Sequence, residues 1–266
     1  MSIPSGYETI RLTPYEDGRI VVMSLDRPEV RNAISRRLAQ ELLDACTHLA
    51  GAPAIRAVVV TGAGDRAFCA GADLTERRTF TTADRLDHLV AIEAAAEALA
   101  ALPLPTVAAV RGYALAGGAE LAIACDLRVA AADAVFGFPE VKVGIFPGAG
   151  GAHRLPRLIG DGAAKDLLFT GRQVPAEEAL RLRLVDRVVP PEETLDEAMA
   201  LARQIAINAP LAVRGVKQAV EQSHGLTVES ARHVVTALRI GLEGTADYEE
   251  GLAAFAEKRA PTFTGT

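Results

Sequence analysis

The stretch from Val107 to Asp126, VAAVRGYALAGGAELAIACD, constrains the fold more than any other part of the sequence. Its β-branched start indicates a strand, Gly112 breaks it, and an Ala/Leu-rich segment predicts a helix over about residues 119–125. The pair Gly117-Gly118 directly before that helix lets a ligand approach bare backbone N–H groups at the positive end of the helix dipole. The stretch therefore predicts a site where negative charge develops on a substrate oxygen.

Two acids lie in apolar or glycine-rich surroundings. Glu120 is a lone acid among small and apolar residues, and Glu140 follows Phe138-Pro139 and precedes the glycine-rich segment 144–151. A carboxylate in such surroundings is costly to bury unless it is protonated, paired or in use. The structural alternative is an ion pair for each acid, and Arg111, Lys142 and Arg154 are the available cations. Together the two acids indicate a general acid/base pair. Such a pair would also suit a glycosidase, but sugar clefts usually carry aromatic residues and this chain has no Trp.

The rest of the chain alternates strand and helix patterns up to about residue 190–205 and is helical afterwards. Strands are expected at residues 9–12, 20–25, 57–61, 107–110, 127–131, 134–136 and 184–189. Helices are expected at residues 36–50, 83–101, 163–170, 175–181, 193–208, 211–223, 227–241 and 248–258. Residues 61–78 read as a long, glycine-containing loop. This pattern predicts an α/β core over residues 1–200 and a helical C-terminal region over residues 201–266.

Charge and cysteine usage exclude several functions. The formal net charge is −6, and no basic run interleaved with aromatic residues suggests nucleic-acid binding. The scattered Cys46, Cys69 and Cys125 suggest neither disulfides nor zinc, so a reducing compartment is expected. The N-terminus lacks the pattern of a secretory leader, and no uncharged apolar run is long enough to span a membrane. We expect a cytoplasmic protein with no metal site.

Two glycine-containing motifs follow the apolar strand at residues 57–61. The segment 62–67 fits G-x-G-x-x-A, but no amphipathic helix starts at Gly64, so dinucleotide binding is disfavoured. The segment Ala70-Gly71-Ala72-Asp73 is either a turn in which Asp73 caps a short helix or a backbone exposed to a ligand, with the Ala70 N–H as donor.

The histidines and the nearby cysteine carry weaker signals. His48 and His88 fall on predicted helices, at faces expected to be solvated, and His153 has no partner at metal-ligand spacing. Cys69 is interpreted as a small packed residue, because no His or helix start is evidently paired with it. The chain has no G-x-S-x-G motif of a serine hydrolase.

Five segments together resemble the enoyl-CoA hydratase/isomerase, or crotonase, family, and they occur in that family's order. They are LDRPEVRNAI (25–34), FCAGADL (68–74), VRGYALAGGAELAIACDLRVA (110–130), FGFPEVKVGIFPGAGGAHRLPRLIG (136–160) and FAEKRAPTF (255–263). The resemblance implies an α/β fold built as a crotonase-like spiral of ββα turns with a C-terminal helical trimerisation region. It also implies a homo-trimer or a hexamer formed as a dimer of trimers.

The resemblance further implies a 2-enoyl-CoA hydratase, a carbon–oxygen lyase of the kind used in fatty-acid β-oxidation. The substrate would be an acyl-CoA thioester, so coenzyme A belongs to the substrate and no separate cofactor is expected. The oxyanion hole would consist of the N–H groups of Ala70 and Gly117. Glu120 would deprotonate the water and Glu140 would protonate C2 of the substrate. The Gly148 N–H would help to position Glu140 or the water.

The resemblance also implies further substrate contacts. Ala70, Gly71, Ala72 and Asp73 would border the substrate together with Gly117 and Gly148. Arg27 and Lys258 would meet the coenzyme A phosphates, unless they form ordinary surface ion pairs. In some members Phe255 and Lys258 come from a neighbouring subunit.

The sequence departs from the family pattern in two places. Position 116 is Ala where many hydratases carry Gly, and little effect is expected there. The segment TERRTFTT (75–82) borders the acyl pocket and leaves the preferred chain length open. Three alternative functions remain: an enoyl-CoA isomerase, a specialised acyl-CoA lyase such as a crotonobetainyl-CoA hydratase, and a non-catalytic acyl-CoA-binding protein.

Overall fold

The strands form two sheets in the computed structural model, which describes residues 4 and 6–266. Within these residues the larger sheet has six strands, in the order β1 (Ile10–Tyr15), β2 (Ile20–Leu25), β3 (Ala57–Gly62), β5 (Thr106–Val110), β7 (Leu127–Ala131) and β10 (Arg187–Val189). The smaller sheet has the order β4 (Ala67–Cys69), β6 (Tyr113–Leu115), β8 (Val135–Gly137) and β9 (Gln173–Pro175). Neighbouring strands are parallel except in the pairs β1–β2 and β8–β9.

Successive turns of the chain repeat one pattern, a strand in the large sheet, a strand in the small sheet, and then one or two helices. The strands are β3–β4, β5–β6 and β7–β8. The helices are α2 (Leu74–Arg77) and α3 (Thr82–Ala100), then α4 (Gly117–Ala124), then α5 (Gly151–Ile159) and α6 (Asp161–Thr170). Equivalent strands of successive turns pair in parallel. The chain is therefore a spiral of ββα turns, which confirms the predicted fold class.

Helices cover both faces of the large sheet, which is why its central strands are largely apolar. Helix α1 (Arg36–Ala50), capped by the Ser35 hydroxyl, has the predicted bounds and packs beside α3. Helix α8 (Thr194–Ala206) lies against β3, β5 and β7 on the other face. The remaining short elements are η1 (Pro28–Val30), η2 (Pro139–Val143), α7 (Ala176–Arg181) and η3 (Pro191–Glu193).

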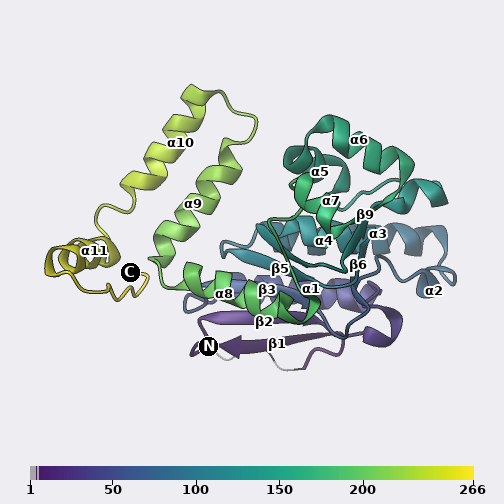
Figure 1. Ribbon diagram of the computed structural model, residues 1–266, viewed down its shortest axis with the longest axis horizontal. Coiled ribbons are helices and arrows are strands. Elements are labelled where there is room, and N and C mark those ends of the chain that lie inside the picture. The colour runs from purple at the N-terminus through teal and green to yellow at the C-terminus, as the bar shows by residue number, and fades with distance from the viewer. Residues whose placement is uncertain (1–3, 5) are drawn as a thin grey trace.

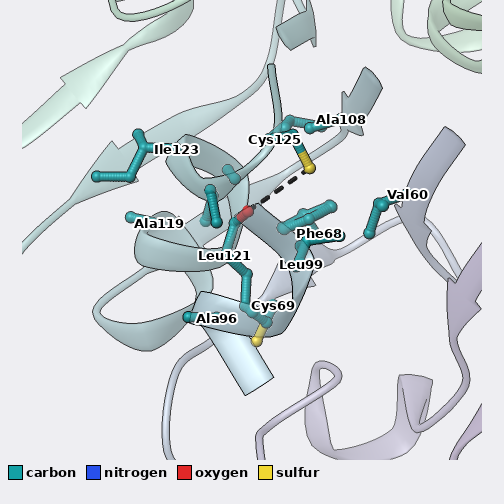
Figure 2. Close-up of a cluster of buried hydrophobic side chains, with 14 of the residues drawn as sticks. Val60, Phe68, Cys69, Ala96, Leu99, Ala108, Ala119, Leu121, Ile123 and Cys125 are labelled. Carbon is teal, nitrogen blue, oxygen red and sulfur yellow. Dashed lines mark hydrogen bonds between the residues drawn. The ribbon is translucent and has the colours of Figure 1, made fainter. Parts of the chain in front are cut away.

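A close approach between α4 and the end of β4 fixes the position of the central stretch. Figure 2 shows the apolar cluster here, with Phe68 and Cys69 from β4 beside Leu121 and Cys125 of the α4 region. A Cβ added at Gly118 would stand 2.1 Å from the Cys69 carbonyl oxygen. Only glycine allows this contact, so the pair Gly117-Gly118 is first of all a packing requirement.

The C-terminal helices leave the body of the molecule after α8. Helices α9 (Pro210–Ser223), α10 (Val228–Ile240) and α11 (Ala246–Glu257) extend to one side, with α11 at the end remote from α4 (Figure 1). The predicted boundary at residue 200 falls inside α8, whose Leu201, Ala202 and Ala206 are buried against the sheet. Helix α8 therefore packs with the α/β core over its whole length.

Several elements differ from the sequence-based prediction. The short strands β4, β6 and β9 and the helix α5 were not expected, and β10 is shorter than the predicted strand. His88 was predicted on a solvated face of its helix, which is wrong, because its side chain is fully buried. The expectation of no N-terminal leader rests partly on residues 1–3 and 5, which lie outside the described residues.

Candidate active site

The loop after β4 runs beside the segment that precedes α1. The Ala70 N–H donates to the Arg31 carbonyl oxygen at 3.0 Å, so it has an acceptor within the protein. The prediction that Ala70 supplies an oxyanion donor is therefore wrong for this conformation of the loop. Gly71 has φ +90°, which reverses the direction of the chain's N–H groups between Ala70 and Ala72.

Ala72 is the residue of this loop with an available donor. It forms an isolated parallel bridge with Ile34, in which Ile34 N–H donates to Gly71 O at 2.8 Å and Asp73 N–H donates to Ile34 O at 2.9 Å. The carbonyl and N–H of a trans peptide point in opposite directions. Because the Gly71 carbonyl faces Ile34, the Ala72 N–H faces away from it, and no described residue accepts its hydrogen.

The Gly117 N–H lies close to that of Ala72. A Cβ built on Gly117 would stand 3.9 Å from the Ala72 nitrogen, and one built on Gly71 would stand 3.4 Å from the Gly117 nitrogen. Gly117 is the first residue of α4, and its N–H has no acceptor among the residues described. We refer to the N–H groups of Ala72 and Gly117 as the anion site, since a helix start and two unpaired donors favour negative charge.

Ala116 turns the chain into α4 through an unusual backbone conformation. Its φ of 50° and ψ of −128° lie where L-residues other than glycine are rarely found. Its methyl group also restricts the neighbouring loop, because a Cβ at Gly71 would stand 2.8 Å from Ala116 Cβ. The alanine at this position therefore holds a strained backbone conformation, and its little effect on function stays a prediction.

Glu120 lies on the first turn of α4 with only 3% of its surface exposed. Its Oε1 accepts a hydrogen bond from the Gly151 N–H at 2.9 Å, at the start of α5. Burial raises the pKa of Glu120, whereas the backbone N–H groups of Gly151 and Ala149 and the charge of Arg154 oppose that rise. Glu120 is thus a buried carboxyl whose charged form is stabilised by backbone N–H groups.

Glu140 lies in η2 and is 8% exposed. Its Oε2 is buried and has no hydrogen-bond partner within the described structure. Burial and, to a smaller extent, the charge of Glu120 together raise the pKa of Glu140 to about 7. The charge of Glu120 thus acts on the Glu140 carboxyl, and the two carboxyls differ in their hydrogen-bond donors: Glu120 has the Gly151 N–H, whereas Glu140 Oε2 has no partner among the described residues.

Arg27 and Asp73 are paired with each other. Asp73 Oδ2 accepts from both terminal nitrogens of Arg27 at 3.1 Å, and Asp73 Oδ1 caps α2 through the N–H groups of Thr75 and Glu76. The Arg27 side chain is largely buried in this pair. The predicted role of Asp73 as a helix cap is confirmed, and Arg27 matches the alternative of an ordinary ion pair.

The other predicted site residues fall at different distances from the anion site. Gly148 lies in the loop before α5, but the N–H of this loop that reaches a glutamate belongs to Gly151. Lys258 caps the C-terminus of α11, remote from α4 within one chain (Figure 1). Burial raises the pKa of Cys69 to about 12, which agrees with its interpretation as a packed residue.

The described residues contain no group of three or more His, Cys, Asp or Glu side chains arranged to hold a metal ion. Nor does any helix within this part of the chain have the length and apolar character needed to cross a bilayer. Sequence reasoning missed Gly151 as the donor to Glu120. The GAGG run of residues 148–151 was a signal for such a donor, although it did not distinguish which glycine acts.

A spiral of ββα turns with two backbone donors and two buried glutamates defines the class of the protein. The chain belongs to the enoyl-CoA hydratase/isomerase family, whose model matches residues 16–266, and it is an enzyme of that family. A crotonyl-CoA hydratase from Syntrophomonas wolfei is 40% identical over 258 residues, covering 97% of this chain and 98% of the relative. An enoyl-CoA isomerase/hydratase from Mycosarcoma maydis is 44% identical, covering 91% of each chain.

A crystal structure of an enoyl-CoA hydratase from Bacillus anthracis superimposes with a TM-score of 0.95 at 40% identity, covering 97% of this chain and all of that one. The fold and family therefore agree with those expected from the sequence.

Proposed function

We propose that the protein is a 2-enoyl-CoA hydratase, which adds water across the C2=C3 bond of a trans-2-enoyl-CoA thioester. The observation that carries the proposal is a pair of buried glutamates: Glu120 on the first turn of α4, the helix that begins at the anion site, and Glu140, one of whose carboxyl oxygens has no partner among the described residues. The family membership and the hydratase names of similar proteins support it. Coenzyme A enters with the substrate, and no separate cofactor takes part.

The anion site binds the thioester carbonyl oxygen through the N–H groups of Ala72 and Gly117. These donors withdraw electron density, so C3 becomes electrophilic and C2 carries enolate character in the transition state. Removal of one such donor typically costs about 10²–10³ in kcat. The Ala72 donor replaces the Ala70 donor expected from the sequence, because the Ala70 N–H is bonded to Arg31.

The two glutamates divide the proton transfers between them. Glu120, stabilised as an anion by the Gly151 N–H, accepts a proton from the water whose oxygen attacks C3. Glu140, whose pKa of about 7 keeps a proton available near neutrality, delivers that proton to C2. The product is a 3-hydroxyacyl-CoA, and a proton passing from Glu120 to Glu140 restores both groups.

The decisive test is product identification with a panel of 2-enoyl-CoA and 3-enoyl-CoA thioesters of increasing chain length. We expect 3-hydroxyacyl-CoA from the 2-enoyl substrates, and the panel also defines the preferred acyl length. Interconversion of 2-enoyl and 3-enoyl thioesters without hydration would assign the protein as an isomerase. Tight binding of acyl-CoA with no turnover would assign it as a non-catalytic member of the family.

We also propose that the C-terminal helices join copies of the chain into a trimer or hexamer. An apolar groove of about 500 Å³ lies among α9, α10 and α11, and it is lined by residues such as Leu211, Val216, Leu238, Leu242, Leu252 and Phe263. Phe255 on α11 is 86% exposed. Surface of this kind usually marks a protein interface. Light scattering should give three or six times the 27.9 kDa chain mass, and a single-chain mass would refute the assembly.

A further inference from the structure

His88 occupies a fully buried position on α3, outside the set of residues used above. Its Nε2 lies 3.0 Å from the Ile34 carbonyl oxygen. The His88 ring meets the Phe80 ring edge-on, with 5.5 Å between their centroids. The Arg36 guanidinium lies over the Phe80 ring, 4.1 Å from its centroid. The imidazole is therefore held between the segment before α1 and the loop that joins α2 to α3.

The contact with Ile34 determines the tautomer of the ring. A carbonyl oxygen only accepts hydrogen bonds, so Nε2 carries the hydrogen that faces Ile34. Burial lowers the pKa of His88 and favours the neutral ring, which leaves Nδ1 without a hydrogen. Nδ1 is the buried atom that has no partner among the described residues. The ring thus forms one directed hydrogen bond, and that bond goes to the backbone.

The peptide groups of Ile34 connect His88 to the anion site. The Ile34 carbonyl accepts from both the Asp73 N–H and His88, while the Ile34 N–H donates to the Gly71 carbonyl. The latter carbonyl belongs to the same amide as the Ala72 N–H. A hydrogen bond at one end of an amide fixes the direction of the other end and polarises its N–H. The side chain of Ile34 also lies against Gly117, since a Cβ there would stand 3.2 Å from Ile34 Cδ1.

We infer that His88 is a positioning residue of the anion site: its Nε2–H holds the Ile34 carbonyl and thereby the Ile34 backbone, whose N–H holds the Gly71 carbonyl and so aims the Ala72 N–H at the substrate's carbonyl oxygen. This inference rests on the proposed function, because it assumes that a thioester carbonyl occupies the anion site. The donors of the anion site are backbone groups, which substitution cannot remove. If His88 positions the Ala72 N–H, a substitution of His88 can change the direction of that donor.

Three substitutions of His88 separate positioning from packing. H88L keeps a similar volume and removes the donor. H88Q places an amide N–H near the position of Nε2, whereas H88N places its amide near Nδ1, where no partner is available. The last two variants match in polarity and differ in the reach of the donor, so H88N is the control for H88Q.

The first readout is the carbonyl stretching frequency of a bound saturated acyl-CoA, measured by infrared difference spectroscopy with a ¹³C-labelled thioester carbonyl. The saturated thioester does not react, so the measurement needs no turnover. We expect the downshift on binding to be reduced in H88L and H88N and restored in H88Q. In hydration assays, kcat should fall by roughly tenfold in H88L and H88N with KM little changed, because a misaimed donor is weakened and not removed.

The outcomes distinguish the inference from the function on which it rests. A wild-type downshift and kcat in folded H88L would overturn the role of His88 and leave the hydratase proposal standing. Equal losses in H88Q and H88N, in step with a lowered Tm, would reduce His88 to a packing residue. Absence of any downshift in the wild-type protein would overturn both the anion site and the role of His88.

Discussion

The two glutamates of the candidate active site lie in regions that differ in the hydrogen-bond donors they offer to a carboxylate. Glu120 stands on a regular helix and faces the start of a second helix, where the Gly151 N–H meets its carboxylate. Glu140 stands in a short 3₁₀ turn, and one of its buried oxygens has no described partner. In the proposed mechanism the same residue type serves as a base in one region and as an acid in the other, and the Gly151 N–H favours the charged form of Glu120.

The largest effect should come from removing either carboxyl. E120Q and E140Q should each lower kcat for hydration by about 10²–10⁴, since each loses one positioned proton transfer. The double variant should be only slightly worse than the worse single variant, because the two groups act as a unit. Steady-state kinetics with a short 2-enoyl-CoA measures this. Independent, multiplicative losses would contradict the division of roles, and wild-type hydration by E120Q would remove Glu120 from the mechanism.

The pH dependence of kcat/KM tests the assignment of Glu140 as the acid. Glu140 must carry a proton, and its pKa is raised to about 7, so activity should fall about tenfold per pH unit above that value. E140Q cannot ionise, so its residual activity should lack this descending limb. A wild-type profile that is flat from pH 6 to pH 9 would exclude Glu140 as the proton donor.

The raised pKa of Glu140 should also affect stability, and here the E140Q substitution should help the protein and not harm it. The folded pKa of Glu140 exceeds that of the unfolded chain, so its stabilising contribution is complete below about pH 4.5 and is lost as the pH rises through about 7. E140Q avoids this loss. Relative to wild type it should be more stable by about 2–3 kcal/mol at pH 8.5 and nearly equal at pH 5. Urea unfolding at fixed protein concentration measures the difference, and a pH-independent difference would contradict the raised pKa.

The smallest effect on kcat should come from displacing the Gly151 N–H, which donates to Glu120. In G151A the new methyl group would stand 2.5 Å from Pro147 Cβ and 3.2 Å from Glu120 Oε1, so the loop must shift. We expect kcat to fall by roughly tenfold through the displaced N–H. G162A is the matched control, because a Cβ at Gly162 meets nothing within 4 Å. Equal kcat in the two variants would show that the Gly151 contact is dispensable.

Long, periodic elements of the fold could be predicted from the sequence, whereas the small sheet could not. The helix at residues 36–50 and the strand at residues 20–25 have the predicted bounds, because burial imposes a visible pattern over many residues. The three-residue strands β4, β6 and β9 are too short to show any period. They exist through pairing within the small sheet, β4 with β6 and both β6 and β9 with β8.

The candidate site likewise contains residues that could be predicted from the sequence and residues that could not. Glu120 and Glu140 could be singled out because a carboxyl among apolar residues is conspicuous in a sequence. The choice between Ala70 and Ala72 could not be made, since it depends on the left-handed conformation of Gly71 and on a bridge to Ile34. The burial of His88 was missed as well. Its helix carries no clear apolar stripe, and the Ile34 carbonyl that it contacts lies 54 residues earlier.

The backbone conformation of Ala116 bears on how the enzyme meets its substrate. A non-glycine residue held in this region costs of order 1–3 kcal/mol, which the surrounding packing must offset. That strain is present before any ligand arrives, and it directs the amide of the next residue, Gly117, out of the helix. The direction of the Gly117 donor is therefore set by the fold of the free protein and not by the substrate.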